Sequence, residues 1–283
     1  MPEPVLAADP VPPSVSPAQV TPRGRRRRPW RAALPWLVPV ALLVVWQTGS
    51  STGLIPDEVL PPISEVLDTG RYLAGTGELQ HHILVSLRRI AIGFGIGALA
   101  GLLLGFAVGM SRLAEGLFDR TLQMVRTIPH LALVPLVIAW FGIGELPKLL
   151  LVALGTLFPV YLNTVNGIRG VEPKLVELGR SYGLGRFGVL RRVVLPGALP
   201  SILTGIRYAL GVAWLTLVVA ETIASRDGIG FLAQNARELL RTDQIVLAIL
   251  LYAIAGFLAD AVIRGVERLS LRWHPHFRRG AAA

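Results

Sequence analysis

The sequence has no cysteine in its 283 residues. Disulfide bonds, thiolate metal ligands and cysteine nucleophiles are therefore excluded. Charged residues are also scarce, because they make up 16% of the chain, whereas an average soluble domain has about 25%. Hydrophobic residues make up 52%, so the composition predicts an integral membrane protein rather than a soluble one.

Two signatures of catalysis are missing as well. The sequence has no H-E-x-x-H and no cluster of carboxylates within an apolar run, which argues against the alternative of an integral-membrane enzyme. A membrane scaffold is a further alternative, but no sizeable soluble segment is present to transmit a signal. His81 and His82 are adjacent, a poor spacing for two metal ligands, and we interpret them as interfacial.

The basic residues lie in short blocks between apolar runs. This distribution favours orientation in a lipid bilayer over binding of nucleic acid, despite the net charge of +10. If the N-terminus is cytoplasmic, most of the 28 Lys and Arg residues fall on the cytoplasmic side. Residues 50–85 on the opposite side are acidic. The charge bias therefore predicts that both termini are cytoplasmic.

Six apolar stretches approach the length of about 20 residues that a helix needs to cross a bilayer. They lie near 34–49, 90–110, 128–143, 147–167, 199–220 and 245–263. Prolines interrupt the first and third stretches. The block RGRRRRPWR ahead of the first resembles a signal peptide, but the long tail before it and the lack of a clear A-x-A site favour a retained helix. We therefore expect an all-α integral membrane fold with about six transmembrane helices.

The second stretch contains a glycine at every fourth position. These residues are Gly93, Gly97, Gly101, Gly105 and Gly109. A spacing of four residues places them on one helix face, which another membrane helix can approach closely. We expect this face to be a packing surface rather than a ligand site.

The segment ELGRSYGLGRFGVLRRVVLPGALPS (177–201) is basic and interrupts two apolar runs. Pro173 suits the first turn of a short helix, and Gly183 suits its end. A second short helix from Arg186 to about Val194 would bury Phe187, Leu190 and Val194. Pro196 would end this helix, and Pro200 would open the next membrane helix. The simplest alternative is an interfacial loop whose arginines bind lipid phosphates.

The same segment resembles a motif of a known transporter family. It reads E-L-G-R-S-Y-G, nine residues, then V-V-L-P, and is similar to the cytoplasmic EAA motif of ABC-importer permeases, E-A-A-x-x-x-G, nine residues, then I-x-L-P. Leu178 and Gly179 replace the two alanines, and Val193 replaces isoleucine. Residues 126–170, 181–184 and 193–243 also resemble permeases of aliphatic-sulfonate importers, a branch that also serves taurine and nitrate.

The resemblance covers roughly residues 85–275 and implies a type I, MetI-like importer fold. It further implies a homodimer of permease subunits, two cytosolic ABC ATPase subunits and an extracytoplasmic substrate-binding protein. The sequence contains no G-x-x-x-x-G-K-[ST], so we expect no cofactor in this chain, and ATP and Mg would be bound by the partner ATPase. The expected substrate is an aliphatic sulfonate; nitrate, taurine or another small solute is the alternative.

Within this family, the segment 177–196 is a pair of coupling helices that docks on the ATPase. The resemblance therefore implies coupling roles for the residues that occupy the motif. Glu177 would pair with a cation of the ATPase, or would only cap or be solvated. The full set of expected coupling residues is Glu177, Leu178, Gly179, Tyr182, Gly183, Phe187 and Pro196.

These expectations divide the chain into four parts. Residues 1–33 form a disordered, basic cytoplasmic tail, and residues 34–84 form the first transmembrane helix and an extracytoplasmic loop. Residues 85–270 form the permease domain with the coupling segment 171–200. Residues 271–283 form a basic cytoplasmic tail. The whole would be a multi-pass protein of the cell membrane.

A few polar residues interrupt the apolar runs. Arg207 lies inside the fifth stretch, where it either extends to the membrane surface or forms a cationic site for an anion. His130 follows Pro129 at an expected helix break and is a second candidate for the translocation pathway. We expect Glu221 to pair with Arg226 or to cap a helix, and Asp260 to face protein or the cytoplasmic interface.

Overall fold

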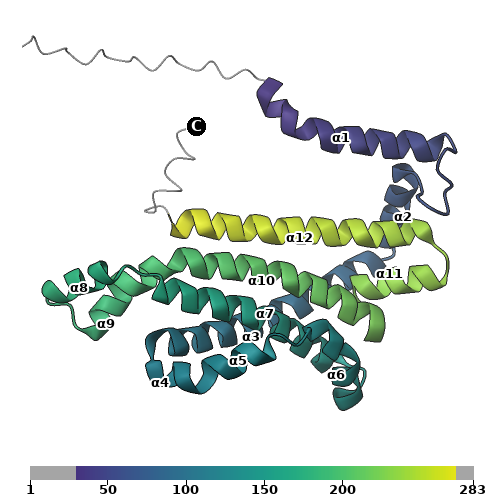
Figure 1. Cartoon of the computed structure of the whole chain (residues 1–283). Coiled ribbons are helices and arrows are strands. Elements are labelled where there is room, and N and C mark those ends of the chain that lie inside the picture. The colour runs from purple at the N-terminus through teal and green to yellow at the C-terminus, as the bar shows by residue number, and fades with distance from the viewer. Residues whose placement is uncertain (1–29, 272–283) are drawn as a thin grey trace, which may run out of the picture. The chain divides into compact units, whose positions relative to one another are not determined.

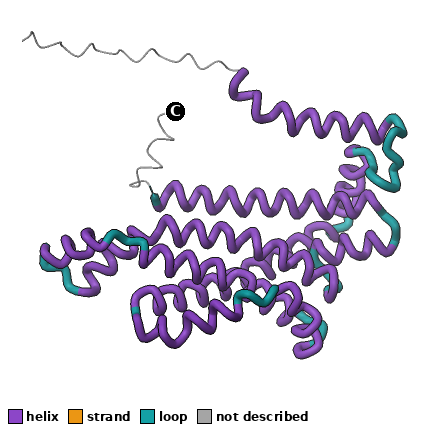
Figure 2. The backbone as a smooth tube through the Cα atoms, in the orientation of Figure 1, coloured by secondary structure: helices purple, strands orange, loops and turns teal. Residues whose placement is uncertain are grey.

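The computed structural model describes residues 30–271, and every regular element in this range is a helix (Figure 1). Figure 2 shows that only short loops and turns join these helices. The predicted tails 1–33 and 271–283 lie outside the described residues, apart from Leu271 and the first residues of α1 (Trp30–Ser51). The chain divides into two units, Met1–Val45 and Trp46–Ala283. All the features discussed below belong to the second unit.

Four helices of the described range are long and apolar enough to cross a membrane. They are α3 (Glu78–Met110), α7 (Glu145–Arg169), the continuous helix Arg186–Ala224 and α12 (Thr242–Ser270). They correspond to the second, fourth, fifth and sixth stretches of the sequence. The described apolar part of α1 is shorter, at Trp36–Ser51.

The third expected helix is not a straight span. The chain there forms two helical stretches, Arg112–Val125 and His130–Phe141, which are bent by 76°. The first contains α4 (Arg112–Ala114), a π-turn (Glu115–Asp119) and α5 (Arg120–Val125); the second contains a 3₁₀ turn (His130–Leu133) and α6 (Val134–Phe141). Pro129 lies at the break in an extended conformation. Because proline disfavours helix at the residue before it, the two stretches cannot join smoothly.

The glycine face of α3 packs against α7, as predicted. A β-carbon added to Gly97 would collide with the backbone oxygen of Ala153, and one added to Gly105 would lie 2.5 Å from Cβ of Thr164. Equivalent atoms at Gly93, Gly101 and Gly109 would also come within 3 Å of α7. The absence of side chains along this face therefore sets the distance between the two helices.

The opposite side of α7 packs against α10 (Leu195–Ala224), so that α7 lies between α3 and α10 (Figure 1). Here Ser201 donates a hydrogen bond of 2.8 Å to the backbone oxygen of Asn163. A β-carbon at Gly167 would lie 2.8 Å from the backbone oxygen of Ala198. Both faces of the central helix thus rely on small residues for close packing.

The segment after α7 forms the predicted pair of short helices. α8 (Pro173–Ser181) has proline in its first turn, and Gly183 follows with a positive φ of 81°. α9 (Arg186–Val189) then leads through a π-turn (Leu190–Val194) directly into α10. Val194 is buried as expected, but Phe187 is 73% exposed, so the expectation that it is buried was wrong.

The prediction that Pro196 ends the second short helix was also wrong, because the helix continues to Ala224. Proline lacks an N–H group, and its ring crowds the carbonyl of the preceding turn. The wider π-turn lies directly before it, and the N–H of Leu195 bonds to the carbonyl of Leu190. This turn relieves the crowding, so proline is accommodated without a break.

The far end of the bundle contains two further helices, α2 (Ile63–Gly75) and α11 (Ile229–Glu238). Their apolar faces pack on the start of α12. The shared core contains Val66, Leu73, Ile229, Leu232, Leu247 and Ala248. The bundle therefore has two distinct ends, one with α8 and α9 and the other with α2 and α11 (Figure 1).

Candidate functional site

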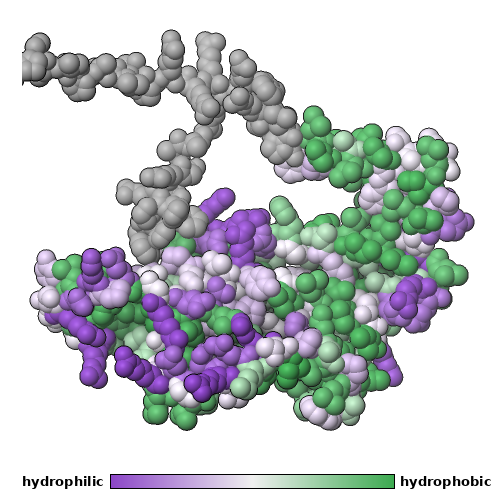
Figure 3. Space-filling view, in the orientation of Figure 1, coloured by the Kyte–Doolittle hydropathy of each residue, from purple (hydrophilic) through white to green (hydrophobic). Residues whose placement is uncertain are grey.

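The pair of short helices α8 and α9 exposes large apolar side chains. Tyr182 is 80% exposed, and Leu178 and Leu175 are about half exposed. Next to them lies a groove of about 410 Å³, here called the helix-pair groove, lined by Leu175, Leu178, Gly179, Tyr182, Leu184, Arg192, Val193, Pro196 and Gly197. Figure 3 shows hydrophilic residues gathered at the same end. An apolar groove with a basic rim is typical of a surface that contacts another protein.

Two glycines shape this surface in different ways. Gly179 is buried where α8 packs on the second helix, and a β-carbon there would lie 3.3 Å from Val193. Gly183 is open to solvent, but its positive φ is a conformation that other residues adopt only with strain. Its N–H donates to the carbonyl of Arg180 at 2.9 Å, which closes the end of α8.

Glu177 lies on the exposed side of α8. Its side chain forms no ion pair with any described residue, and only its backbone oxygen is bonded, by the hydroxyl of Ser181 at 3.1 Å. The carboxylate is therefore available to a partner. Of the seven expected coupling residues, Leu178, Gly179, Tyr182 and Pro196 line the groove. Gly183 lies in the chain between the lining residues Tyr182 and Leu184, and Glu177 and Phe187 are exposed on α8 and α9.

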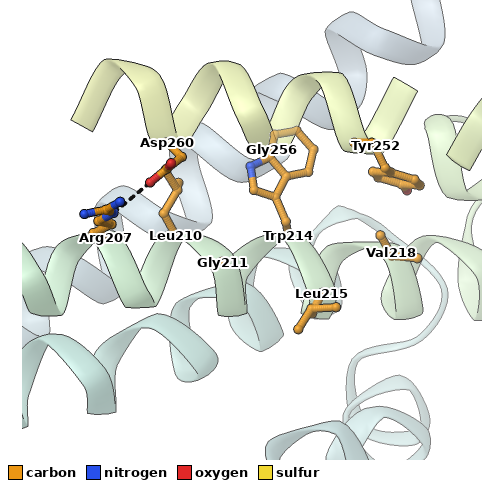
Figure 4. Close-up of a pocket in the computed structure, with 10 residues that line it drawn as sticks. Arg207, Leu210, Gly211, Trp214, Leu215, Val218, Tyr252, Gly256 and Asp260 are labelled. Atoms are coloured by element: carbon orange, nitrogen blue, oxygen red, sulfur yellow. Dashed lines mark hydrogen bonds and ion pairs between the residues drawn. The ribbon is translucent and has the colours of Figure 1, made fainter. Parts of the chain in front are cut away.

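Arg207 points from α10 toward α12 rather than along its own helix to the surface (Figure 4). Its Nε donates to Oδ1 of Asp260 at 2.8 Å, and its Nη1 lies 3.7 Å from Glu267. Arg264 bonds to the other oxygen of Asp260. The two arginines and two carboxylates are balanced in charge, which lowers the cost of keeping them between apolar helices.

His130 lies on the other side of α10 from this ion-pair network. Its Nε2 is 3.0 Å from the hydroxyl of Thr216, and a β-carbon at Gly155 would lie 3.2 Å from the imidazole. The hydroxyl of Thr216 donates its proton to the carbonyl of Val212, so Nε2 of His130 must be the donor to Thr216. The structure therefore does not bring His130 and Arg207 together.

A buried charged cluster lies at the opposite end of the bundle from α8. Arg89 is 1% exposed and bonds to Glu145, Glu221 and Asp227. Glu221 is fully buried and also accepts hydrogen bonds from Ser86, Tyr252 and the N–H of Gly230. We call these residues, together with His82, the Arg89 cluster. It joins α3, α7, α10, α12 and the loop before α11 through groups that are nearly all paired.

The sequence analysis missed this cluster. Arg89 directly precedes the second predicted stretch, 90–110, but α3 begins earlier than expected, at Glu78, and encloses it. Glu221 pairs with Arg89 instead of Arg226. His82 is buried rather than interfacial, and its Nδ1 accepts the N–H of Gly228 at 3.0 Å. The available signal was Glu221 itself, since a carboxylate in an apolar run requires a partner.

Comparison with known families gives one match over most of the bundle. The family described as "Binding-protein-dependent transport system inner membrane component" matches residues 93–271. Among curated relatives, an aliphatic sulfonates transport permease protein of Escherichia coli is 53% identical over 86% of this chain and 92% of the relative. The taurine transport system permease protein of the same organism is 38% identical over 88% of this chain and 94% of the relative. A nitrate import permease protein of Leptolyngbya laminosa is 30% identical over 78% of this chain and 81% of the relative.

Solved structures share the fold at low sequence identity. An amino acid ABC transporter with histidines aligns with a TM-score of 0.56 and 19% identity, covering 73% of this chain and 97% of that chain. The methionine ABC transporter in inward-facing conformations aligns with a TM-score of 0.51 and 19% identity, covering 64% of this chain and 92% of that chain. Both similarities support the expected importer permease fold.

Proposed function

Because this chain belongs to the family of binding-protein-dependent transport system inner membrane components, we propose that it is the permease subunit of an ABC importer for aliphatic sulfonates. It is a transport subunit and not an enzyme. The observation that supports an aliphatic sulfonate as the substrate is the 53% identity to the aliphatic sulfonates permease, which extends over 86% of the chain. The identities to the taurine and nitrate permeases are lower.

The importer would be assembled around two copies of this chain. Only 11% of the apolar window of α12 is buried, which leaves a long apolar surface for lipid or for a second copy. A binding protein outside the membrane would deliver the substrate. Two cytosolic ATPase subunits would bind ATP and Mg, and both termini of this chain would be cytoplasmic.

The ATPase would be engaged through the segment 177–196. The exposed Tyr182 and Phe187, together with Leu178, are the apolar side chains available to enter a groove on a partner. Glu177 would pair with a cation of the ATPase. The helix that starts at Arg186 continues through the membrane to Ala224 without a break. Movement of the ATPase would thereby be passed to α10, and alternating access would follow from rocking of the helices.

The two candidate pathway residues are supported unequally. Arg207 lines a cavity and keeps part of its side chain exposed, which suits contact with a passing anion. His130 is packed between Gly155 and Thr216, so a direct role in the pathway rests only on its half-buried position. We propose Arg207 as the principal pathway residue.

The proposal is tested by uptake. A strain that lacks this permease should fail to grow on ethanesulfonate or pentanesulfonate as the only sulfur source, and a plasmid copy of this chain should restore growth. Uptake of labelled taurine and nitrate is measured in the same strains. Restored uptake of taurine or nitrate without sulfonate uptake would assign the second candidate substrate instead. Hydrolysis of a substrate by the purified chain alone would contradict a transport role.

A further inference from the structure

A cavity of about 470 Å³ lies between α10 and α12. Arg207, Gly211, Trp214 and Val218 line it from α10, at the spacing of one helix face, and Tyr252, Gly256 and Asp260 line it from α12. Figure 4 shows Arg207 and Asp260 at one end, Trp214 in the middle and Tyr252 toward the other end. Most of the remaining wall is apolar, with Leu210, Leu215 and Ala253. A volume of this size suits a small organic ligand.

Trp214 carries an unpaired donor in this cavity. Its side chain is only 8% exposed, and its indole N–H has no hydrogen-bond partner within residues 30–271. Figure 4 shows the indole nitrogen on the ring edge that faces Arg207 and Asp260. A buried N–H without an acceptor costs about 1–3 kcal/mol, so an acceptor at this place would remove a penalty that the protein now carries.

Two glycines keep the cavity open. A β-carbon added to Gly211 or to Gly256 would meet no atom within 4 Å. These glycines differ from those of the α3 face, where added β-carbons would collide with α7. Close packing of helices therefore does not explain Gly211 and Gly256. Their effect is to leave space between the guanidinium of Arg207 and the indole of Trp214.

The polar groups of the cavity that are free to bind a ligand are donors rather than acceptors. Both oxygens of Asp260 are already bonded, one by Arg207 and the other by Arg264, so this carboxylate is neutralised. Of the five N–H donors of Arg207, only Nε–H has a hydrogen-bond acceptor in the described part of the chain. The guanidinium and the indole thus offer donors, whereas the acceptor groups are occupied.

We infer that the cavity between α10 and α12 binds a short alkanesulfonate during import, an inference that rests on the proposed function. The sulfonate oxygens accept hydrogen bonds from Arg207 in the space that Gly211 and Gly256 leave open, and from the indole N–H of Trp214, which a small rotation of the ring would bring to the cavity surface. The alkyl chain lies against Leu215 and Val218. Hydrogen bonds to a charged oxyanion are strong in an apolar environment, and the apolar wall adds affinity with each methylene of the chain. Trp214 is therefore a specificity-determining residue.

The test measures binding of ³⁵S-labelled pentanesulfonate to the purified permease with its ATPase, in phosphatidylcholine nanodiscs and without the binding protein. Wild type should bind saturably. Gly256→Leu should fill the cavity and weaken binding at least tenfold. Gly265→Leu is the matched control, because Gly265 lies on the same helix and its β-carbon would also meet no atom within 4 Å. It should bind as wild type does.

A second pair of variants isolates the hydrogen bond. Trp214→Phe removes the N–H but keeps an aromatic ring, and should weaken binding about tenfold. Trp140→Phe changes an exposed tryptophan and should have no effect. Absence of saturable binding by wild type, or equal binding by Gly256→Leu and Gly265→Leu, would overturn the inference. Folding of each variant is checked by circular dichroism and gel filtration.

The outcomes separate this inference from the proposed function. If wild type imports pentanesulfonate and both cavity variants import it with unchanged KM and rate, the function stands and the cavity site is wrong. If no sulfonate is imported but pentanesulfonate still binds and Gly256→Leu weakens it, the proposed substrate is wrong while the site remains. If phosphatidylglycerol in the nanodiscs displaces pentanesulfonate, the cavity is a lipid site, which also contradicts the inference.

Discussion

Arg89 and Glu221 lie 132 positions apart in the sequence and form an ion pair of 2.8 Å in which both side chains are almost completely buried. The pair joins α3 to the last turns of α10. Further groups complete it. Glu145 and Asp227 bond to Arg89, while Ser86, Tyr252 and the N–H of Gly230 bond to Glu221. Burying two charges is costly, and it is offset only when nearly every donor and acceptor has a partner, as they do here.

Removal of Arg89 should therefore destabilise the protein severely. Arg89→Met leaves Glu221 buried without its cation, and we expect a loss of about 3–5 kcal/mol. Arg71→Met is the control, because Arg71 and Asp68 form an ion pair whose two side chains are exposed, and it should change stability little. Thermal unfolding of the detergent-purified variants measures both. Equal unfolding midpoints for the two variants would show that the buried pair does not stabilise the fold.

The glycine face of α3 should tolerate no side chain. In Gly97→Ala the new methyl group would collide with the backbone of Ala153, so α3 and α7 must separate, at a cost of about 1–3 kcal/mol. Gly95→Ala adds the same group to the same helix, where no atom lies within 4 Å. Yield and thermal stability should fall only for Gly97→Ala. A drop of similar size in both variants would point to the helix itself rather than to its packing.

Two glycines of the proposed coupling segment provide a matched pair. Gly183 has a φ of 81°, whereas Gly185 has a φ of −65°, and a β-carbon at either would meet no atom. Gly183→Ala should strain the end of α8 by about 1–2 kcal/mol, and Gly183→Val should strain it more. We expect Gly183→Val to reduce uptake and ATPase co-purification strongly, and Gly185→Ala to leave both intact. Normal uptake by a well-expressed Gly183→Val protein would argue against a coupling role.

The exposed carboxylate of Glu177 should matter for assembly and not for folding. Glu177→Lys reverses a charge that has no ion-pair partner among the described residues, so thermal stability should be unchanged while ATPase co-purification is lost. Glu238→Lys makes the same charge change on α11, at the opposite end of the bundle. It should retain the ATPase. Loss of the ATPase in both variants would indicate a general effect of net charge.

The absence of cysteine makes the orientation directly measurable. Arg186→Cys introduces a single thiol at an exposed position of α9, without any need to remove native cysteines. In intact cells a membrane-impermeant maleimide should not label it, and after permeabilisation labelling should be complete. Arg237→Cys on α11 is the opposite case and should be labelled in intact cells once the outer face is accessible. Labelling of Arg186→Cys in intact cells would place the segment 177–196 outside the membrane, where a cytosolic ATPase cannot bind it.

The sequence predicted the features that depend on local spacing. The four-residue repeat of glycines identified the packing face of α3, since a helix brings every fourth residue to nearly the same side. The glycine and proline positions around Pro173 and Gly183 identified α8 and its end. These features require no knowledge of distant parts of the chain.

The sequence did not predict the features that depend on long-range contacts. The Arg89 cluster combines residues from widely separated segments, and no local pattern marks Arg89 as buried. The continuation of the helix through Pro196 depends on a π-turn, which has no clear sequence signature. The cavity beside Trp214 depends on the pairing of α10 with α12, which hydropathy alone cannot give.

The unbroken helix from Arg186 to Ala224 has a mechanical consequence. Glu221 fixes the C-terminal end of this helix within the Arg89 cluster. A force applied to α9 at the other end would therefore rotate the helix about Glu221. At a rise of 1.5 Å per residue, Arg186 lies about 52 Å from Glu221 and Gly211 about 15 Å. A swing of about 5 Å at Arg186 would then displace the cavity wall by only about 1.5 Å. If the proposed ATPase acts at α9 and the proposed ligand lies beside Gly211, a large movement of the ATPase would produce a much smaller displacement of the cavity wall.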